Sequence, residues 1–327
     1  MMRRALTLAA EGRFSTSPNP RVGCIIAHGG QIVGQGFHLK AGGPHAEVHA
    51  LRQAGENARG ATAYGRTPPC AEALIQAGVS RVVAAIADPN PQVAGKGLAM
   101  LSAAGIRTES GLLETEAREL NRGFLSRIER GRPFVRLKCA ASLDGKTALS
   151  DGLSQWITGE AARHDVQILR AESCAVLTGI GTVLADDPQL NVRAFPTLRQ
   201  PLRIVLDSRL RLPPTAKLLA DPASPVLLLT AVPPEKYPAA LTAVPHLDIL
   251  TVPAADGRIS LPAALTLLAE RGIGELLVEA GATLCGAFLQ SGLADEIVLY
   301  QAGKILGGNA RSLFDLPENP AALQQPA

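Results

Sequence analysis

The chain has 327 residues, of which 46% are hydrophobic and 19% charged, and its net charge is +3. This composition predicts a folded globular protein with room for two domains and excludes an intrinsically disordered chain. Aromatic residues make up only 3% of the chain and the net charge is small, so no nucleic-acid partner is expected.

The cysteines and the N-terminal residues indicate a compartment. Five cysteines stand at positions 24, 70, 139, 174 and 285, and their odd number and wide spacing favour a reducing environment over a disulfide framework. The first ten residues hold two arginines and an apolar run too short for a secretion signal. No stretch approaches the roughly 20 apolar residues of a membrane helix, so we expect a cytoplasmic protein with no membrane partner.

The first half of the chain alternates between predicted strands and helices, which favours a three-layer α/β/α domain. The order is a helix over 3–12, strands over 22–27 and 31–36, a helix over 45–54, a strand over 61–64, a helix over 70–77, a strand over 81–86 and a helix over 97–104. Gly29-Gly30 predicts a hairpin between the first two strands. A charged helix over 114–130 then leads to Gly131-Arg132-Pro133, which marks a boundary between domains 1–130 and 131–327.

The second half also alternates, which predicts a second α/β domain. Its predicted strands cover 134–140, 174–178, 203–206, 225–229, 247–251, 275–278 and 296–300, with helices over 160–171, 261–271 and 282–290. Gly179-Ile180-Gly181 predicts a turn. Gly281 follows a strand and opens a helix, where N–H groups are suited to a phosphate, but no G-x-G-x-x-G fingerprint of a Rossmann domain accompanies it.

Pro44-His45-Ala46-Glu47-Val48 carries the clearest chemistry of the first half. Zinc deaminases hold the metal with a histidine at a helix start, while a nearby glutamate moves the proton, and cysteine thiolates from a second helix start complete the site. Cys70 follows two prolines at such a start, where the pKa of a thiol is lowered. We therefore predict His45 and Cys70 as metal ligands and Glu47 as a catalytic residue. Without Cys70, a helix cap and a surface glutamate would be the better interpretation of the pair.

Further motifs accompany this pair in order along the chain. They are Asn19-Pro20-Arg21-Val22-Gly23-Cys24, His38, Ala54-Gly55-Glu56, Gly60-Ala61-Thr62-Ala63-Tyr64, Gly65-Arg66-Thr67-Pro68-Pro69-Cys70 and Asp88-Pro89-Asn90-Pro91. Together with the histidine and the glutamate they resemble the deaminase half of the RibD family. That family comprises the bifunctional diaminohydroxyphosphoribosylaminopyrimidine deaminases and 5-amino-6-(5-phosphoribosylamino)uracil reductases of riboflavin biosynthesis, with a cytidine-deaminase-like first domain.

One departure from the family pattern affects the zinc site. In the family a strand leads into Thr-Leu-Glu-Pro-Cys-Ser-His, which supplies the first zinc cysteine, whereas here Gly65 follows Tyr64 directly. Two explanations stay open: the site has been lost, or the printed sequence lacks a segment of the protein. Zinc is therefore expected as a cofactor only if that segment exists.

The second half resembles the reductase domain of the same family, which is similar in fold to dihydrofolate reductase. The resemblance rests on residues 138–146, 154–159, 181–188, 190–193 and 276–284. It implies NADPH as the cofactor, bound by Ala140, Trp156, Thr182, Asp186, Gly281, Ala282, Thr283, Leu284, Cys285, Gly286 and Ala287. It also implies a small phosphorylated pyrimidine as substrate, bound by Ser154, Arg170, Leu190, Arg193 and Glu279. The forked guanidinium of an arginine suits a phosphate. Without the resemblance, the arginines would be interpreted as solvated charges and Trp156 as a core residue.

These motifs imply a riboflavin-biosynthesis enzyme. Its first domain is expected to remove the amine of a pyrimidine by hydrolysis, and its second to reduce the ribosyl group to ribityl with NADPH. One alternative is a reductase alone, with a degenerate and zinc-free deaminase domain. Another is a non-catalytic nucleotide-binding module. Zinc content separates the first two hypotheses, and oxidation of NADPH tests the third. A homo-oligomer is also expected, although no sequence feature sets its subunit number.

Overall fold

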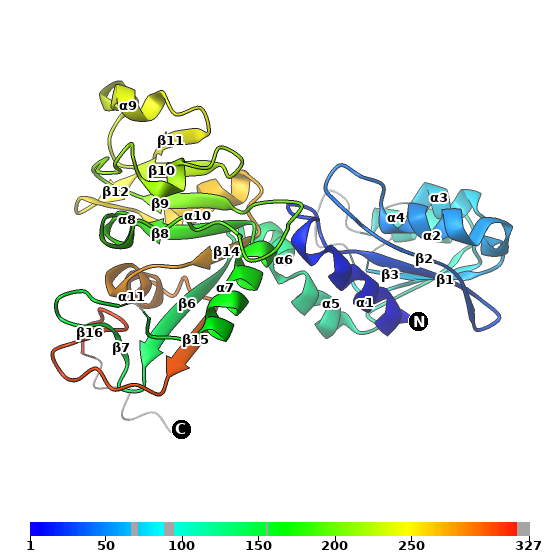
Figure 1. Cartoon of the computed structure of the whole chain (residues 1–327). Coiled ribbons are helices and arrows are strands. Elements are labelled where there is room, and N and C mark those ends of the chain that lie inside the picture. Colours follow the sequence, from blue (N-terminus) through cyan, green and yellow to red (C-terminus); the bar gives the residue numbers. More distant parts are fainter. Residues whose placement is uncertain (67–70, 88–94, 155, 319–327) are drawn as a thin grey trace. The chain divides into compact units, whose positions relative to one another are not determined.

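The computed structural model describes residues 1–66, 71–87, 95–154 and 156–318 (Figure 1). The chain divides into two compact units. Unit 1 comprises Met1–Pro133 with Leu268–Gly274, and unit 2 comprises Phe134–Leu267 with Glu275–Ala327. Within the described residues, no helix has the length and apolar character to cross a membrane.

Unit 1 contains a five-stranded sheet in the order β2-β1-β3-β4-β5. The strands are β1 Gly23–His28, β2 Gln31–Phe37, β3 Thr62–Gly65, β4 Arg81–Ala84 and β5 Arg107–Ser110. Strand β1 is antiparallel to β2 and β3, while β3, β4 and β5 run parallel. The hairpin predicted between β1 and β2 is confirmed, because Gly29 and Gly30 both adopt positive φ, of 57° and 83°.

Helices cover both faces of this sheet, so the predicted three-layer α/β/α arrangement is confirmed (Figure 1). The helices are α1 Met2–Glu11, α2 Ala46–Ala54, α3 Ala71–Gln76, α4 Lys96–Ala103, α5 Glu114–Leu120 and α6 Arg122–Arg130. Alternation along β1 sends Cys24 and Ile26 to a core shared with α2, α3 and α4. Ile25 and Ala27 face a second core, shared with α1, α5 and α6.

Helix α2 lies unusually close to strand β2, because two glycines on the strand make room for its backbone. A Cβ added to Gly34 would lie 2.1 Å from the carbonyl oxygen of Ala50, and one added to Gly36 would lie 2.7 Å from that of Ala46. Any larger residue would push the helix away from the sheet. These two glycines therefore fix the start of α2, where His45 and Glu47 are found.

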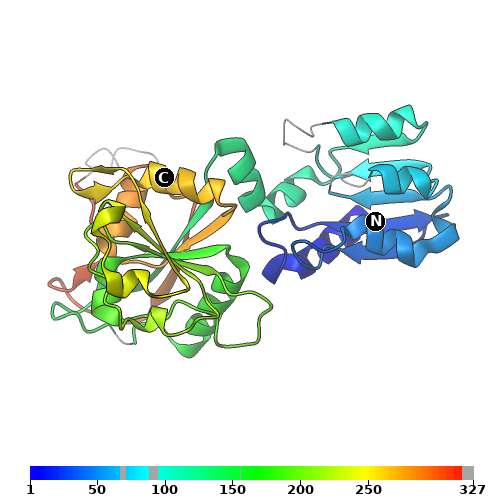
Figure 2. The same cartoon turned by 90° about the horizontal axis from the view of Figure 1, so that it is seen from above.

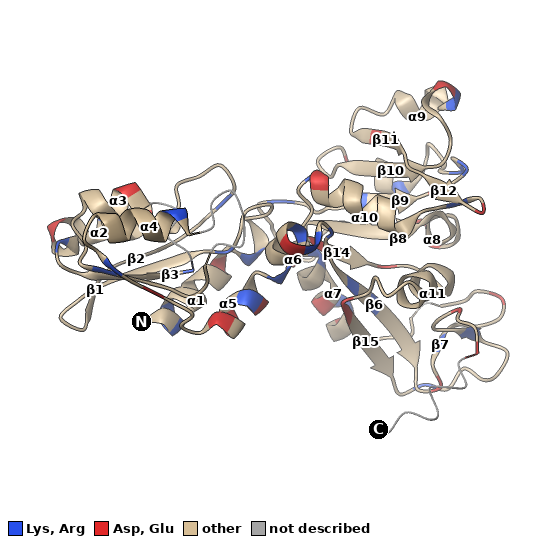
Figure 3. Cartoon of the chain, turned by 180° about the vertical axis from the view of Figure 1, so that it is seen from behind, with Lys and Arg blue, Asp and Glu red and all other residues tan. Residues whose placement is uncertain are grey.

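The single helix predicted over 114–130 is wrong, because it is divided at Asn121 into α5 and α6. The side chain of Asn121 accepts a hydrogen bond from the backbone N–H of Arg21 (2.8 Å) and donates to the carbonyl oxygen of Arg21 (3.1 Å). Its backbone leaves the helical region, with φ −116°. Both helices carry charges of both signs (Figure 3), and Arg118 pairs with Glu129 at 2.7 Å.

Unit 2 contains a seven-stranded sheet in the order β11-β10-β9-β8-β14-β6-β15, and its strands run parallel (Figure 2). They are β6 Phe134–Ser142, β8 Ala175–Gly179, β9 Leu202–Leu206, β10 Val226–Thr230, β11 Leu247–Thr251, β14 Glu275–Val278 and β15 Glu296–Ala302. Two small ribbons pair β7 Lys146–Ala148 with β16 Arg311–Ser312, and β12 Ala254–Ala255 with β13 Arg258–Ile259. Because the strands are parallel, their carboxyl ends meet at one edge, where ligands usually bind in such sheets.

The sheet of unit 2 is buried on both faces. Val176 and Leu277 pack against Leu190 and Leu169, while Leu177, which points the other way, is only 1% exposed. The helices of this unit are α7 Glu160–Glu172, α8 Ile180–Asp186, α9 Ala239–Thr242, α10 Leu261–Glu270 and α11 Ala282–Gln290. Short 3-10 helices cover Gly12–Phe14, Gly55–Ala58, Lys217–Leu219 and Pro234–Lys236. The turn predicted at Gly179-Ile180-Gly181 is wrong, since α8 begins directly after β8.

Candidate functional site

The start of α2 brings two histidines together in unit 1. His45 caps the helix, and its ring centroid lies 5.8 Å from that of His38. The Nδ1 of His38 donates to the carbonyl oxygen of Pro44 (3.1 Å), so its Nε2 is left to accept from the amide of Asn19 (3.2 Å). Burial and the neighbouring His38 lower the pKa of His45. A neutral imidazole is the form that can ligate a metal.

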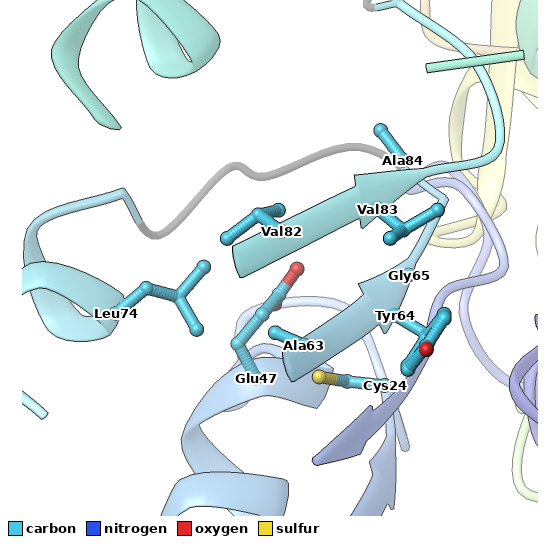
Figure 4. A pocket seen from close by; sticks show the side chains of 9 residues that line it. All are labelled: Cys24, Glu47, Ala63, Tyr64, Gly65, Leu74, Val82, Val83 and Ala84. Atoms are coloured by element: carbon cyan, nitrogen blue, oxygen red, sulfur yellow. The ribbon is translucent and has the colours of Figure 1, made fainter. Parts of the chain in front are cut away.

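Glu47 lies two residues further, in the first turn of α2, and is almost completely enclosed, at 2% exposure. The alternative of a surface glutamate is therefore wrong. Its carboxylate faces a cavity of about 10 Å³, roughly the space of one water, lined by Cys24, Glu47, Ala63, Tyr64, Gly65, Leu74, Val82, Val83 and Ala84 (Figure 4). Neither carboxylate oxygen has a hydrogen-bond partner among the described residues. Burial raises the pKa of Glu47 to about 7, although its own backbone N–H and then the charge of Arg66 act in the opposite direction. A carboxyl that titrates near neutral pH is suited to proton transfer.

The metal-binding part of this site is incomplete within the described residues. They contain no group of three or more His, Cys, Asp or Glu side chains that could hold a metal ion. His45 is in place, whereas Cys70 lies outside the described ranges. Strand β3 continues from Tyr64 into Gly65 without a loop, and the next residue, Arg66, still pairs with the strand beside it: its carbonyl oxygen accepts from Ile86 at 2.9 Å.

A buried ion pair dominates the candidate site of unit 2. Glu279 directly follows β14 and Arg170 lies on α7, and they are 9% and 8% exposed. Arg170 donates to both carboxylate oxygens of Glu279, at 2.6 and 3.0 Å, and also to the carbonyl oxygen of Asn191 at 3.0 Å. Burial would raise the pKa of Glu279, but the charge and hydrogen bonds of Arg170 outweigh it and leave the pKa lowered. Two predicted substrate residues therefore contact each other directly.

Two further cations lie near this pair. The Nζ of Lys138, on β6, is 3.9 Å from Glu279. The sequence motifs give no role to Lys138, although it is the first residue of the motif over 138–146. Arg193 is exposed, and its pKa is lowered by partial burial and by the charge of Arg170, while Glu279 acts in the opposite direction. Lys138, Arg170 and Arg193 thus surround one carboxylate, which leaves net positive charge for an anionic ligand.

The predicted cofactor residues gather around the start of α11. Gly281 caps this helix with extended backbone, and a Cβ added to it would meet nothing closer than the hydroxyl of Thr182, at 4.0 Å. The space beside the backbone N–H groups at the start of α11 is therefore open. Gly286, in contrast, faces inward: an added Cβ would lie 2.2 Å from the carbonyl oxygen of Asp315, so packing alone requires a glycine here. Cys285 is likewise buried. Asp186 ends α8 and is exposed.

Trp156 lies on the segment between β7 and α7 and is 62% exposed, so the alternative of a core residue is wrong. The guanidinium of Arg163 lies 4.5 Å from the centroid of its ring. The carbonyl oxygen of Trp156 accepts a hydrogen bond from the Nζ of Lys304 at 2.7 Å. Ser154 is on the same segment, and Ala140 is on β6, half-buried. Leu190 is only 3% exposed, so its main chain is the part left to meet a ligand.

Comparisons with known proteins agree with the two units. The model of the RibD C-terminal domain matches residues 133–326, and that of the cytidine and deoxycytidylate deaminase zinc-binding region matches residues 1–86. The chain is 50% identical to the riboflavin biosynthesis protein RibD of Escherichia coli, over 97% of this chain and 90% of that protein. It is 51% identical to the protein of the same name from Haemophilus influenzae, over 97% and 88%. The first alignment spans 337 positions, more than the 327 residues of this chain, so the relative has residues that this chain lacks.

Solved structures give the same result. Acinetobacter baumannii RibD, form 1, superposes with a TM-score of 0.92 at 48% identity, over 99% of this chain and 91% of that chain. A diaminohydroxyphosphoribosylaminopyrimidine deaminase/5-amino-6-(5-phosphoribosylamino)uracil reductase from Thermotoga maritima superposes with a TM-score of 0.86 at 34% identity, over 98% and 90%.

Proposed function

Since the chain belongs to the RibD family, we propose that it acts on phosphorylated pyrimidines in two successive steps of riboflavin biosynthesis. It is a riboflavin-biosynthesis enzyme with a deaminase domain and a reductase domain, which we assign to residues 1–130 and 131–327. The family matches in both halves favour this function over a reductase alone or a non-catalytic module. The first step is the hydrolytic loss of an amine, and the second reduces the ribosyl group of a phosphoribosylaminouracil to ribityl.

The observation that carries the reductase assignment is the buried Arg170–Glu279 pair with two further cations around it. Arg170 already donates to Glu279 and Asn191, so it orients the carboxylate and the neighbouring loop. Arg193 is exposed and is the arginine that we assign to the substrate phosphate. Ser154, the main chain of Leu190 and Glu279 are proposed to contact the rest of the substrate.

The residues of unit 2 fit NADPH, the cofactor that the family implies. The open N–H groups at the start of α11 are suited to its phosphates, with Thr182 beside Gly281. We assign Ala140, Trp156, Thr182, Asp186 and the segment 281–287 to this cofactor. NADPH supplies the hydride, so the tasks of the protein are to orient the two ligands and to place charge around them.

The residues of unit 1 do not complete the zinc site that the family implies. Catalytic zinc takes three protein ligands, whereas His45 and Cys70 supply two. The only other cysteine of the first 130 residues is Cys24, which is buried within β1. We therefore expect this chain of 327 residues to bind zinc poorly. The zinc-dependent part of the deaminase function remains a proposal that metal content decides.

One experiment separates the hypotheses. The full chain is purified with zinc supplied, its metal content is measured, and NADPH oxidation is followed with the phosphoribosylaminouracil substrate. We expect substrate-dependent oxidation of NADPH and far less than one zinc per chain. One tightly held zinc per chain would show that the donor set is complete after all. No oxidation of NADPH by folded protein would overturn the reductase assignment.

A further inference from the structure

We propose that Gln200 and Gln167 are positioning residues, which hold the segment 189–193 so that Arg193 meets the phosphate of the substrate. We call this segment the phosphate loop. The inference rests on the proposed reductase function, because it takes Arg193 as the phosphate ligand. Neither glutamine is among the residues that the sequence motifs suggested.

The phosphate loop is fixed by side chains. The amide of Gln200 contacts both backbone groups of Val192: its Oε1 accepts from the N–H at 2.8 Å, and its Nε2 donates to the carbonyl oxygen at 2.8 Å. Such a two-point contact fixes a peptide as a neighbouring strand would. Gln167, on α7 and 7% exposed, accepts from the backbone N–H of Arg193 at 2.9 Å.

The other residues of the loop are held in the same way. Arg203, which is fully buried, donates to the carbonyl oxygen of Gln189 at 3.3 Å, and Arg170 donates to that of Asn191 at 3.0 Å. Leu190 has φ 56°, a conformation that is unfavourable for leucine, and its side chain is buried. Each of the five residues is therefore fixed by a different anchor. A surface loop without a ligand to meet would not need this degree of fixation.

Repulsion between Arg170 and Arg193 would displace the phosphate loop if it were not anchored. Partial burial and, after it, the charge of Arg170 lower the pKa of Arg193, so the two guanidinium groups are close enough to repel. Glu279 compensates only in part, because Arg170 already occupies both of its oxygens. An unanchored loop would move Arg193 away from Arg170. A bound phosphate dianion removes the repulsion, so the anchored loop holds Arg193 where the phosphate is needed.

Loss of the anchor has a specific kinetic signature. The phosphate is remote from the carbon that accepts the hydride, so its contact is equally strong in the ground state and in the transition state. Weakening such a contact raises KM and leaves kcat nearly unchanged. A general loss of structure would lower kcat and the affinity for NADPH as well.

The test uses the full chain with Gln200→Leu, which removes both hydrogen bonds at similar size. Gln200→Glu keeps the acceptor for the N–H of Val192 and loses the donor. Gln290→Leu is the matched control, because Gln290 is an exposed residue at the end of α11. We expect KM for the phosphoribosylaminouracil to rise about tenfold in Gln200→Leu and less in Gln200→Glu, with kcat within about twofold of the parent. The Kd of NADPH should match that of the control, while the melting temperature should fall modestly, because two buried backbone groups of Val192 lose their partners.

A double-mutant cycle with Arg193→Ala completes the test. If Gln200 acts through Arg193, then Gln200→Leu has no further effect on KM once Arg193 is absent. Additive effects of the two changes would overturn the proposal, as would a joint fall of kcat and NADPH affinity. If Arg193→Ala itself leaves KM unchanged, the phosphate assignment of the reductase is what fails. If Arg193→Ala raises KM and Gln200→Leu does not, only the positioning role fails.

Discussion

Glu47 and Glu279 are two buried glutamates, one in each unit, and the protein treats them in opposite ways. Glu47 is 2% exposed and has no hydrogen-bond partner for either oxygen among the described residues, and burial raises its pKa to about 7. Glu279 is 9% exposed, but two hydrogen bonds from Arg170 hold it ionised, with a lowered pKa.

The difference shows what each carboxyl is suited for. An unpartnered carboxyl that titrates near neutral pH can take up and release a proton, and it destabilises the fold whenever it is ionised. A carboxylate locked by an arginine keeps its charge and its orientation, which suits the placement of other groups. We therefore expect substitutions of Glu47 to act mainly on reactivity, and a break in the Arg170–Glu279 pair to act mainly on stability and ligand placement.

The largest effect is expected for Glu47→Gln in the deaminase reaction. The amide retains the size of the side chain but cannot move a proton. In protein that contains the family segment after Tyr64 and holds zinc, deamination should fall by roughly 10²–10⁴-fold, the usual scale of acid–base catalysis. The measurement is the release of ammonia by parent and variant at equal zinc content. A variant that deaminates at the parental rate would remove Glu47 from the mechanism, while NADPH oxidation serves as the internal control.

The comparison is sharpened by removal of the partner in unit 2. Arg170→Leu leaves the carboxylate of Glu279 buried without its partner, and breaking a buried pair typically costs about 3–5 kcal/mol. Native-state hydrogen exchange of the amides of β14, the strand before Glu279, measures the loss within unit 2. The double variant Arg170→Leu/Glu279→Leu should recover much of the loss. The control is Lys217→Leu, which breaks the exposed pair with Asp187 in the same unit and should cost less than about 1 kcal/mol. Equal losses for Arg170→Leu and Lys217→Leu would contradict the role of burial.

Features that depend on neighbouring residues in the sequence could be predicted from it, whereas contacts between distant residues could not. The helix start at His45, the glutamate in the first turn and the hairpin at Gly29-Gly30 depend on local patterns, and the structure has them where the sequence predicted them. The parallel sheet of unit 2 follows from alternating strands and helices in the same way. The chain itself lacks the family segment after Tyr64, and no fold can supply the missing ligand.

Contacts between distant residues were not predictable in the same way. Arg170 and Glu279 were both predicted to bind substrate, but their direct pairing across 109 positions depends on the packing of α7 against β14. Gln200 belongs to none of the sequence motifs, and only the structure shows the hydrogen bonds between its amide and the backbone of Val192. The break at Asn121 was missed because its cause, the backbone of Arg21, lies 100 positions earlier.

A third prediction concerns stability as a function of pH. The folded-state pKa of Glu47 lies above its ordinary value, so its ionisation destabilises the fold as pH rises from about 4.5 to about 7, and the loss is complete above that range. In metal-free protein, Glu47→Gln should thus be more stable than the parent by about 3.5 kcal/mol at pH 8 and nearly equal to it at pH 4, since one pKa unit corresponds to about 1.4 kcal/mol. Native-state hydrogen exchange of the amides of β4 measures this within unit 1. A difference that does not change with pH would mean that Glu47 is not the titrating group.

The smallest effect is expected where the charge is exposed. Arg193→Ala removes one phosphate contact at the edge of unit 2, so KM for the phosphoribosylaminouracil should rise about tenfold, which corresponds to about 1.4 kcal/mol of binding. The Kd of NADPH should stay within about twofold, because the nicotinamide cofactor is assigned to other residues. Arg193→Lys keeps the charge but loses the fork, and its KM should lie between those of the parent and the alanine variant. The measurements are steady-state NADPH oxidation and a cofactor titration on each variant. Equal loss of affinity for both ligands would move Arg193 to the cofactor site, and the contrast would then rest on the buried Arg170–Glu279 pair alone.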